Sequence, residues 1–408
     1  MAAPAYLPQG AQPADGLAPR LLDGNKAAAY GVLLCRPDLI AAYPITPQTP
    51  LLEQLYKFKA DGRLTAETVE VEGENSALSA ALGVTVAGGR AFTATSSMGL
   101  TFMYDAYLFA SGTRVPVVMV IAMREQTAPT TVSCGQQDLM MVKEGGWVQL
   151  VCESCQEILD SILVAYRLAE DPQVQLPVNV CYEGYYLSHL SEPVTVPAQE
   201  AVDRFLLPVR DKRRPVLGTE HPMTFGTYVV GELYAEYRYK HCQAMERAGG
   251  MLDAIDGEFR AALGRPYGGA VEAYRAEDAE FLMVTMGSAA GTLKVVVDEL
   301  RKEGIAAGLA RVRMFRPLPA RELLGLMRGK RAVGVVDRSV SFGWNRGHLF
   351  IDVKAVAQDL EPRIPVVSFI GGLAGTDLRR DLLAGAARTT WERGRGRAGA
   401  EVIWLGLE

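Results

Sequence analysis

The sequence predicts an α/β protein: a doubly wound parallel sheet followed by a second, smaller α/β unit. Between residues 23 and 190, segments with a helical period alternate with short uncharged runs such as "AFTATS" and "VPVVMVIAM". Strands of a parallel sheet are covered by helices on both faces, so they form continuous apolar runs in the sequence. The same alternation returns between residues 276 and 408, and it predicts the second unit.

The chain is expected to divide into four parts. Residues 1–22 are rich in proline and alanine, and we expect an N-terminal arm that is either disordered or laid across a partner subunit. Residues 23–190 form the first α/β domain. Residues 191–275 combine a proline-rich, charged stretch with a polar helical stretch, which is typical of a connector. Residues 276–408 form the second α/β domain.

Composition and charge exclude several classes of partner. The chain has 408 residues and a formal net charge of −5, so nothing in its electrostatics favours nucleic acid. Its most apolar run, "VPVVMVIAM", is far shorter than the roughly 20 residues that a membrane helix needs. The first residues lack the basic and apolar regions of a signal peptide. We therefore expect a cytoplasmic protein with no membrane or nucleic-acid partner.

The cysteines and histidines predict no metal site in this chain. "CESC", at residues 152–155, has the spacing of a metal-binding knuckle, but no second pair accompanies it. Buried thiols explain the motif better. The four histidines are scattered along the chain and form no ligand pair.

Polar residues follow the expected strands at their carboxyl ends, where open parallel sheets bind their ligands. These residues are Thr46, Glu74, Ser96, Ser97 and Arg124. One carboxylate, one guanidinium and several hydroxyls should therefore meet on one rim of the sheet. The arginine suits a ligand that carries a carboxylate or a phosphate, because its planar fork pairs with two oxygens.

Each of these residues also has a purely structural interpretation. Thr46 could cap the helix that follows it, and so could Ser96 and Ser97. Glu74 and Arg124 could pair with each other as a structural salt bridge. The segment "VEVEGENSALSAALG", residues 69–83, is interpreted as a strand that runs into a tightly packed helix of small residues, with Glu74 at the boundary.

Four motifs in this order resemble one family. "AYPITPQTP", "VEVEGENSALSAALG", "AFTATSSMGL" and "VPVVMVIAMREQ" resemble the α subunit of the 2-oxoacid:ferredoxin (acceptor) oxidoreductases of the pyruvate, oxalate and phenylglyoxylate type. The resemblance continues through "MGSAAGTLKVVVDELRKEG" and covers nearly the whole chain beyond the arm. It implies a thiamine diphosphate enzyme that decarboxylates a 2-oxoacid and transfers the acyl group to coenzyme A. The first domain would bind the pyrimidine of the cofactor, and the second would be transketolase C-terminal-like.

The resemblance also implies roles for single residues. Glu74 matches the family glutamate that bonds N1′ of the aminopyrimidine, which favours the imino tautomer that removes the thiazolium C2 proton. Thr46 and Arg124 match the residues that hold the 2-oxoacid carboxylate. Ser96 and Met98 match cofactor-binding positions.

The family's other groups must lie on other chains. Thiamine enzymes hold Mg²⁺ and diphosphate on a "GDG" segment, which this sequence lacks, and its cysteine spacings do not fit a [4Fe–4S] cluster. The resemblance therefore implies a β subunit carrying the diphosphate half-site, a γ subunit and a ferredoxin-like δ subunit. Electrons would pass to iron–sulfur clusters on these partners, with or without a flavoprotein subunit that reduces NAD.

The sequence leaves the substrate and two other function classes open. After Arg124 the segment "EQTAPTTVSCGQQDLM" departs from the pyruvate-type members, and Met123, Thr127 and Thr130 could reshape the acyl pocket. An aromatic 2-oxoacid such as phenylglyoxylate is one candidate, beside pyruvate, oxalate and branched 2-oxoacids. The alternatives are a transketolase- or E1-like thiamine enzyme subunit, which "YPITP" fits less well, and a non-catalytic scaffold. Retention of Thr46, Glu74 and Arg124 argues against a scaffold.

Overall fold

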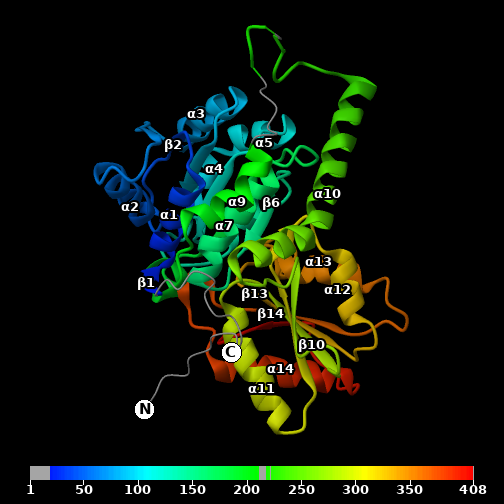
Figure 1. Ribbon diagram of the computed structural model, residues 1–408. Helices are drawn as coiled ribbons and strands as arrows, with labels where there is room; N and C mark the ends of the chain where they lie inside the picture. Colours follow the sequence, from blue (N-terminus) through cyan, green and yellow to red (C-terminus); the bar gives the residue numbers. More distant parts are fainter. Residues whose placement is uncertain (1–18, 211–216, 221, 408) are drawn as a thin grey trace.

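The computed structural model describes residues 19–210, 217–220 and 222–407, and it confirms the α/β prediction. Two sheets, each covered by helices on both faces, lie end to end (Figure 1). The first sheet has seven strands in the order β12 (Met314–Arg316), β6 (Val148–Val151), β7 (Val178–Glu183), β5 (Val118–Met123), β4 (Ala91–Thr95), β2 (Leu39–Ala41) and β3 (Glu67–Val69). All of them run parallel except β12, which is antiparallel to β6.

Helices cover both faces of this sheet because successive side chains of a strand point to opposite sides. In β5, Val120 and Ala122 belong to one apolar cluster, and Ile121 and Met123 belong to the other. The first cluster is closed by α1 (Gly24–Cys35), α2 (Thr49–Ala60) and α7 (Cys155–Ala169). The second is closed by α3 (Glu74–Val86), α4 (Ser97–Phe102), α5 (Tyr104–Gly112) and α6 (Gln137–Met141).

The strand expected through Glu70, Glu72 and Glu74 is shorter than the sequence indicated. β3 ends at Val69, which pairs with Ala41, the last residue of β2. Beyond that pair β3 has no neighbour, so the chain leaves the sheet and exposes Glu70 and Glu72. Glu74 is the first residue of α3 rather than the last residue of a strand.

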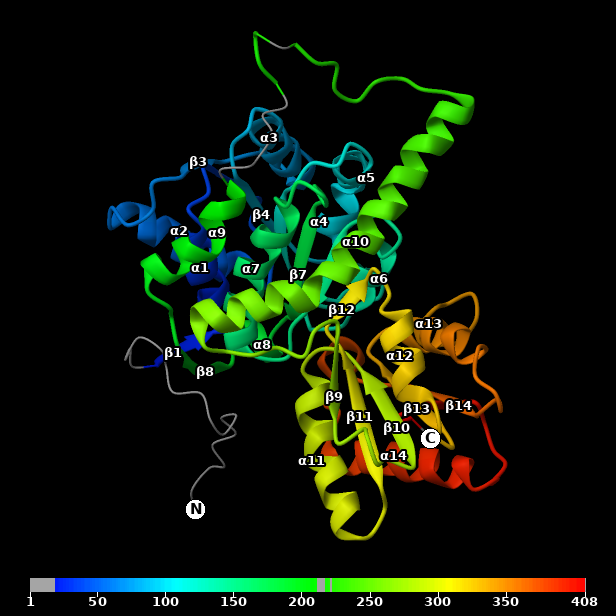
Figure 2. The same cartoon turned by 45° about the vertical axis from the view of Figure 1, so that its right-hand side comes forward.

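The chain between the two large sheets packs on the outside of the first domain. Residues 1–18 of the expected arm lie outside the described residues, but β1 (Arg20–Asp23) pairs with β8 (Ser191–Val194). α8 (Tyr186–His189) precedes β8, and α9 (Gln199–Arg210) follows it. The C-terminal half of α10 (Gly231–Leu263) packs on α7 and α9, whereas its exposed N-terminal turns extend past the body (Figure 2). No helix within the described residues has the length and apolar character needed to cross a membrane.

The second sheet has six strands and shares its core with the first domain. Their order is β15 (Val402–Trp404), β14 (Val366–Ile370), β13 (Val333–Asp337), β10 (Phe281–Thr285), β11 (Ala307–Val312) and β9 (Val271–Tyr274). Only the β9–β11 pair is antiparallel. α11 (Ala289–Lys302) and α14 (Arg380–Gly394) pack on one face, and α12 (Ala320–Met327) and α13 (His348–Ala357) pack on the other.

One strand joins the two domains directly. A single stretch of chain forms β11 in the second sheet and then, after Arg313, β12 at the edge of the first. The apolar cluster that contains Ile121 also contains Val284 and Val335 of the second sheet. The two domains are therefore built as one packed body.

A buried group of charges reinforces this junction. Glu157 on α7 lies 2.9 Å from Nη1 of Arg311 and 3.1 Å from Nε of Arg313, and all three side chains are almost fully buried. Arg313 also pairs with Asp256 of α10 at 2.6 Å. Buried charges are tolerated only when they are paired, so removal of one partner leaves the others uncompensated.

We expect Glu157→Gln to lower the free energy of unfolding by about 3 kcal/mol, since the amide leaves two buried guanidinium groups short of negative charge. Urea unfolding followed by circular dichroism measures this. The control is Glu258→Gln, which removes the half-exposed partner of Arg167 and should cost less than about 1 kcal/mol. Equal losses in the two variants would contradict a special role for the buried group.

Candidate functional site

The candidate site lies between two neighbouring strands whose following helices cover opposite faces of the sheet. After β2 the chain continues into α2 on one face, and after the neighbouring β4 it continues into α4 on the other face. A crevice at the carboxyl ends of such strands is the usual ligand site of an open α/β sheet. Thr46 follows β2, Ser96 follows β4 and Arg124 follows β5, as the sequence predicted.

Glu74 places a buried carboxylate next to α4, the helix that follows β4. Glu74 is only 7% exposed. Within the described residues, its carboxylate has no hydrogen-bond or ion-pair partner. A Cβ at Gly99 on α4 would lie 2.5 Å from Oε1 of Glu74 and 2.4 Å from Oγ1 of Thr95. The Thr95 hydroxyl is also buried without a partner among the described residues. Only glycine at position 99 leaves room for these unused polar groups.

Arg124 is a buried cation held by neutral acceptors. Its Nε donates to the carbonyl oxygen of Thr131 and its Nη1 to that of Thr46, each at 2.9 Å. No carboxylate in the described part of the chain pairs with the guanidinium. The structural salt bridge between Glu74 and Arg124, the alternative left open by the sequence, is therefore not formed. A buried guanidinium without a counter-charge favours the binding of an anion.

Thr46 lies directly beside Arg124, through the carbonyl contact just described. The residue is exposed, and it does not cap α2, since that helix begins at Thr49 with Gln48 in the capping position. Asn25 holds the loop by donating to the carbonyl oxygen of Pro47 at 2.9 Å. The structure thus brings Thr46 and Arg124 together and leaves the threonine accessible.

The hydroxyls of the two serines after β4 donate to backbone carbonyl oxygens near the end of β5. Ser96 Oγ donates to the carbonyl oxygen of Ala122 at 2.7 Å, and Ser97 Oγ donates to that of Glu125 at 2.5 Å. Ser96 stands at the capping position of α4, but its side chain makes no capping hydrogen bond. Of the two cofactor contacts that the resemblance implied, Ser96 is therefore buried and engaged, whereas Met98 is 39% exposed on α4.

Asp138 is a site residue that sequence reasoning missed. This fully buried carboxylate accepts hydrogen bonds from the backbone N–H of Ser97 and of Arg124 on one oxygen, each at 2.9 Å. Its other oxygen accepts from the N–H of Leu139 at 2.8 Å. Burial raises the pKa of Asp138 to about 7, although these amide donors oppose the shift. A single aspartate in a short helix gives no signal in the sequence.

The loop that follows Arg124 is braced by the second domain. The backbone N–H of Ala374, in the short 3₁₀ helix η1 (Leu373–Gly375), donates to Glu125 Oε1 at 3.2 Å. The N–H of Gly375 donates to the carbonyl oxygen of Cys134 at 2.8 Å. Burial raises the pKa of Glu125. Both ends of the loop are therefore fixed, while its middle lies at the surface.

Of the three residues expected to shape an acyl pocket, one points elsewhere. Met123 is fully buried in the core, because the alternation along β5 turns its side chain away from the strand end. Thr127 and Thr130 are exposed in the loop after Arg124, with their hydroxyl oxygens 3.1 Å apart. Only these two threonines remain as candidates for contact with an acyl group.

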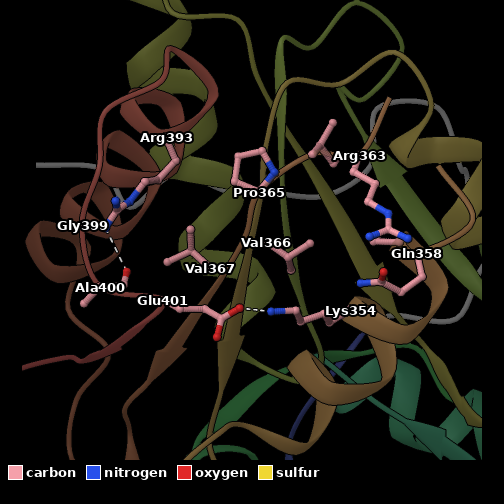
Figure 3. Close-up of a pocket in the computed structure, with 12 residues that line it drawn as sticks. Lys354, Gln358, Arg363, Pro365, Val366, Val367, Arg393, Gly399, Ala400 and Glu401 are labelled. Carbon is pink, nitrogen blue, oxygen red and sulfur yellow. Dashed lines mark hydrogen bonds and ion pairs between the residues drawn. The ribbon is translucent and has the colours of Figure 1, made fainter. Parts of the chain in front are cut away.

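A separate cavity of about 300 Å³ lies in the second domain, between the ends of α13 and α14 and the start of β14 (Figure 3). Lys354 pairs with Glu401 there, and Arg393 donates to the carbonyl oxygen of Ala400 at 2.9 Å. Two of the three cations that line it are thus already engaged within the chain. The cavity includes none of the residues at the carboxyl ends of the first sheet.

Two family models match this chain. The family model described as pyruvate flavodoxin/ferredoxin oxidoreductase, thiamine diP-binding, matches residues 30–256, and the model for pyruvate:ferredoxin oxidoreductase core domain II matches residues 279–382. The chain is 42% identical over 366 residues to the NADH-dependent phenylglyoxylate dehydrogenase subunit alpha of Aromatoleum evansii, covering 88% of this chain and 87% of that one. It is also 42% identical over 389 residues to the pyruvate synthase subunit PorA of Methanothermobacter thermautotrophicus, covering 95% and 98%.

The fold has a solved counterpart. The 2-oxoglutarate:ferredoxin oxidoreductase from Magnetococcus marinus superposes with a TM-score of 0.70 at 20% identity, over 93% of this chain and 67% of that chain. The first match includes Thr46, Glu74 and Arg124 and every strand of the first sheet except β12, and the second includes β12 and the strands β10, β11, β13 and β14 of the second sheet. This chain belongs to the pyruvate flavodoxin/ferredoxin oxidoreductase family.

Proposed function

We propose that this chain is the α subunit of a multi-subunit 2-oxoacid:acceptor oxidoreductase. The complex would convert a 2-oxoacid and coenzyme A to acyl-CoA and CO₂ and pass the electrons to iron–sulfur clusters. The observation that carries the proposal is the pair of buried, uncompensated charges, Glu74 and Arg124, in the domain that matches the thiamine diphosphate-binding family model. Relatives at about 40% identity are themselves named as subunits of such oxidoreductases.

The residues around Glu74 fit the pyrimidine half of thiamine diphosphate. The buried carboxylate has no hydrogen-bond partner within the described residues, and Gly99 lets α4 approach it more closely than a Cβ would allow. Thiamine diphosphate, when bound, would supply the nucleophilic carbon that the decarboxylation of a 2-oxoacid needs. Glu74 would accept a hydrogen bond at N1′ of the aminopyrimidine and hold the proton there. α3 and α4 would limit the access of water to that contact, which strengthens it.

Arg124 would bind the carboxylate of the substrate. Two backbone carbonyl groups hold the guanidinium in one orientation, so little side-chain freedom is lost when an anion binds. Its positive charge would orient the 2-oxoacid until the carboxylate leaves as CO₂. The accessible hydroxyl of Thr46, next to the guanidinium, is placed to contact the same group.

The remaining parts of the reaction are assigned to partner subunits. The sequence has no "GDG" segment for Mg²⁺ and diphosphate, so we propose a β subunit that supplies this half of the cofactor site. A γ subunit and a ferredoxin-like δ subunit with [4Fe–4S] clusters complete the proposal, with or without an NAD-reducing flavoprotein. We propose a cytoplasmic complex in which this chain carries half of the active site.

Two substrates are supported by named relatives at equal identity, phenylglyoxylate and pyruvate. We propose an aromatic 2-oxoacid as the first candidate, because the loop after Arg124 departs from the pyruvate-type pattern. The exposed position of Thr127 and Thr130 leaves the wall of the acyl pocket at the surface of this chain, where a partner subunit would complete it.

The proposal is tested on the complex purified from its native host. Mass spectrometry identifies the subunits that co-purify, and viologen reduction is measured with phenylglyoxylate, pyruvate and oxalate in turn, with and without coenzyme A. We expect partner chains that carry a "GDG" segment and iron–sulfur clusters, and reduction that depends on coenzyme A. A purified complex that reduces viologen with none of these 2-oxoacids would contradict the proposal for this group of substrates.

We expect Glu74→Gln to slow exchange of the cofactor's C2 proton in the complex by at least about 100-fold, since a neutral amide is a poor partner for the N1′ proton. Nuclear magnetic resonance after rapid quenching in D₂O measures this exchange without any substrate. The matched control is Glu72→Gln, an exposed carboxylate nearby that accepts from Ser76 Oγ at 2.6 Å and should leave exchange unchanged. Normal exchange in Glu74→Gln would place Glu74 outside the chemistry.

We expect Arg124→Met to raise KM for the 2-oxoacid by about ten- to a hundredfold, because a hydrogen bond to a charged group contributes roughly 1.5–3 kcal/mol. The content of bound thiamine diphosphate should stay normal. Arg124→Lys should restore only part of the affinity, since an ammonium group lacks the planar fork. Steady-state kinetics measures KM, and cofactor analysis of the same preparations measures bound thiamine diphosphate. Loss of the cofactor in Arg124→Met would instead assign Arg124 to cofactor binding or folding.

A further inference from the structure

Asp138 connects two parts of the site that the sheet itself does not connect. β4 and β5 pair as far as Thr95 and Ile121, and the strands then diverge into α4 and into the loop after Arg124. Just beyond the last pair, one oxygen of Asp138 accepts hydrogen bonds from both Ser97 N–H and Arg124 N–H. The carboxylate thus links the two chain segments just after the hydrogen bonds between β4 and β5 end.

From these two amides, short paths lead to the two functional charges. Ser97 is the first residue of α4, and two residues later Gly99 packs against the Glu74 carboxylate. Arg124 is itself the cation of the site. The distance between the cofactor carboxylate and the substrate guanidinium therefore depends on how closely α4 is held to the end of β5.

We propose that Asp138 is a positioning residue that fixes Arg124 relative to Glu74, and so sets the substrate carboxylate against the cofactor. This inference rests on the function proposed above. Asp138 touches neither substrate nor cofactor in this assignment, and it acts through the backbone of Ser97 and Arg124.

The chemistry of the group explains why an aspartate is needed. Three backbone N–H groups converge on it, and a carboxylate offers acceptor sites on both oxygens. An asparagine has the same shape but only one acceptor oxygen, so it can accept from Ser97 and Arg124 only by turning its NH₂ towards the N–H of Leu139, which is also a donor. The start of α4 would then be held to the end of β5 by the bonds of Ser96 Oγ to Ala122, of Ser97 Oγ to Glu125 and of Gln126 Nε2 to the Ser97 carbonyl oxygen, none of which involves the N–H of Arg124.

The second domain offers a matched control. Asp337 at the end of β13 is also fully buried, and its carboxylate accepts from the backbone N–H groups of Leu349 and Phe350 at the start of α13. Burial raises the pKa of both aspartates to about 7. Asp337→Asn therefore makes the same change in the same kind of environment, but away from Arg124 and α4.

The experiment compares Asp138→Asn with Asp337→Asn in the assembled complex. For Asp138→Asn we expect KM for the 2-oxoacid to rise about tenfold and kcat to fall, with normal thiamine diphosphate content. Asp337→Asn should lower the unfolding temperature by a similar amount and leave KM unchanged. Combined with Arg124→Met, Asp138→Asn should raise KM little further, because the two changes affect one interaction.

Hydrogen exchange gives a readout that does not depend on activity. In the wild-type complex the amides of Ser97 and Arg124 should exchange slowly although they lie beyond the last paired residues, and Asp138→Asn should accelerate these two selectively. Asp337→Asn should accelerate those of Leu349 and Phe350 instead. Fast exchange of Ser97 and Arg124 in the wild type would overturn the inference even if no variant assembles.

Two kinetic outcomes would also overturn it: an unchanged KM in Asp138→Asn, or increases in KM that follow lost stability equally in both aspartate variants. A wild-type complex without 2-oxoacid activity would refute the proposed function instead. The exchange of the Ser97 and Arg124 amides would then still decide whether Asp138 holds the two strand ends together.

Discussion

The site depends on a buried guanidinium that has carbonyl groups, rather than a carboxylate, for neighbours. Arg124 donates to the backbone oxygens of Thr46 and Thr131, which fix its direction without neutralising its charge. An acidic partner within the chain would have stabilised the fold more strongly and would have competed with any anionic ligand. The protein keeps other buried arginines paired, as Arg90 is with Glu170 on both carboxylate oxygens, so the exception at Arg124 is selective.

The second domain contributes to this site from a distance. Its backbone contacts Glu125 and Cys134 at the two ends of the loop after Arg124. Nearby, the buried carboxylate of Glu183 at the end of β7 accepts from the N–H of Ser288 at 3.2 Å, and a Cβ at Gly287 would lie 2.0 Å from it. Because the carboxyl ends of the two sheets meet in this way, a shift of the second domain would be transmitted directly to the loop that carries Thr131.

The sequence was sufficient for the features that depend on period and composition. Buried parallel strands and the polar residues at their ends could be located, because apolar runs and strand ends are local properties. The placement of β12 in the first sheet could not be predicted, since nothing local distinguishes it from the end of β11. The role of Asp138 was missed for the same reason: its partners lie 41 and 14 residues away, and all of them are backbone amides, which leave no side-chain signature.

Ser96 and Met123 show the opposite difficulty, where a side chain next to the site turns away from it. For Met123 this follows from the two-residue period of β5, which places successive side chains on opposite faces. Ser96 lies beyond the end of β4, and its hydroxyl is engaged by the carbonyl oxygen of Ala122. Three groups near the strand ends lack a counter-charge or a hydrogen-bond partner within the described residues: the Glu74 carboxylate, the Arg124 guanidinium and the hydroxyl of Thr95. Burying a charge without a counter-charge, or a polar group without a hydrogen-bond partner, costs free energy. A ligand that satisfies them removes that cost in the folded state alone, so its binding and the stability of the subunit must be coupled.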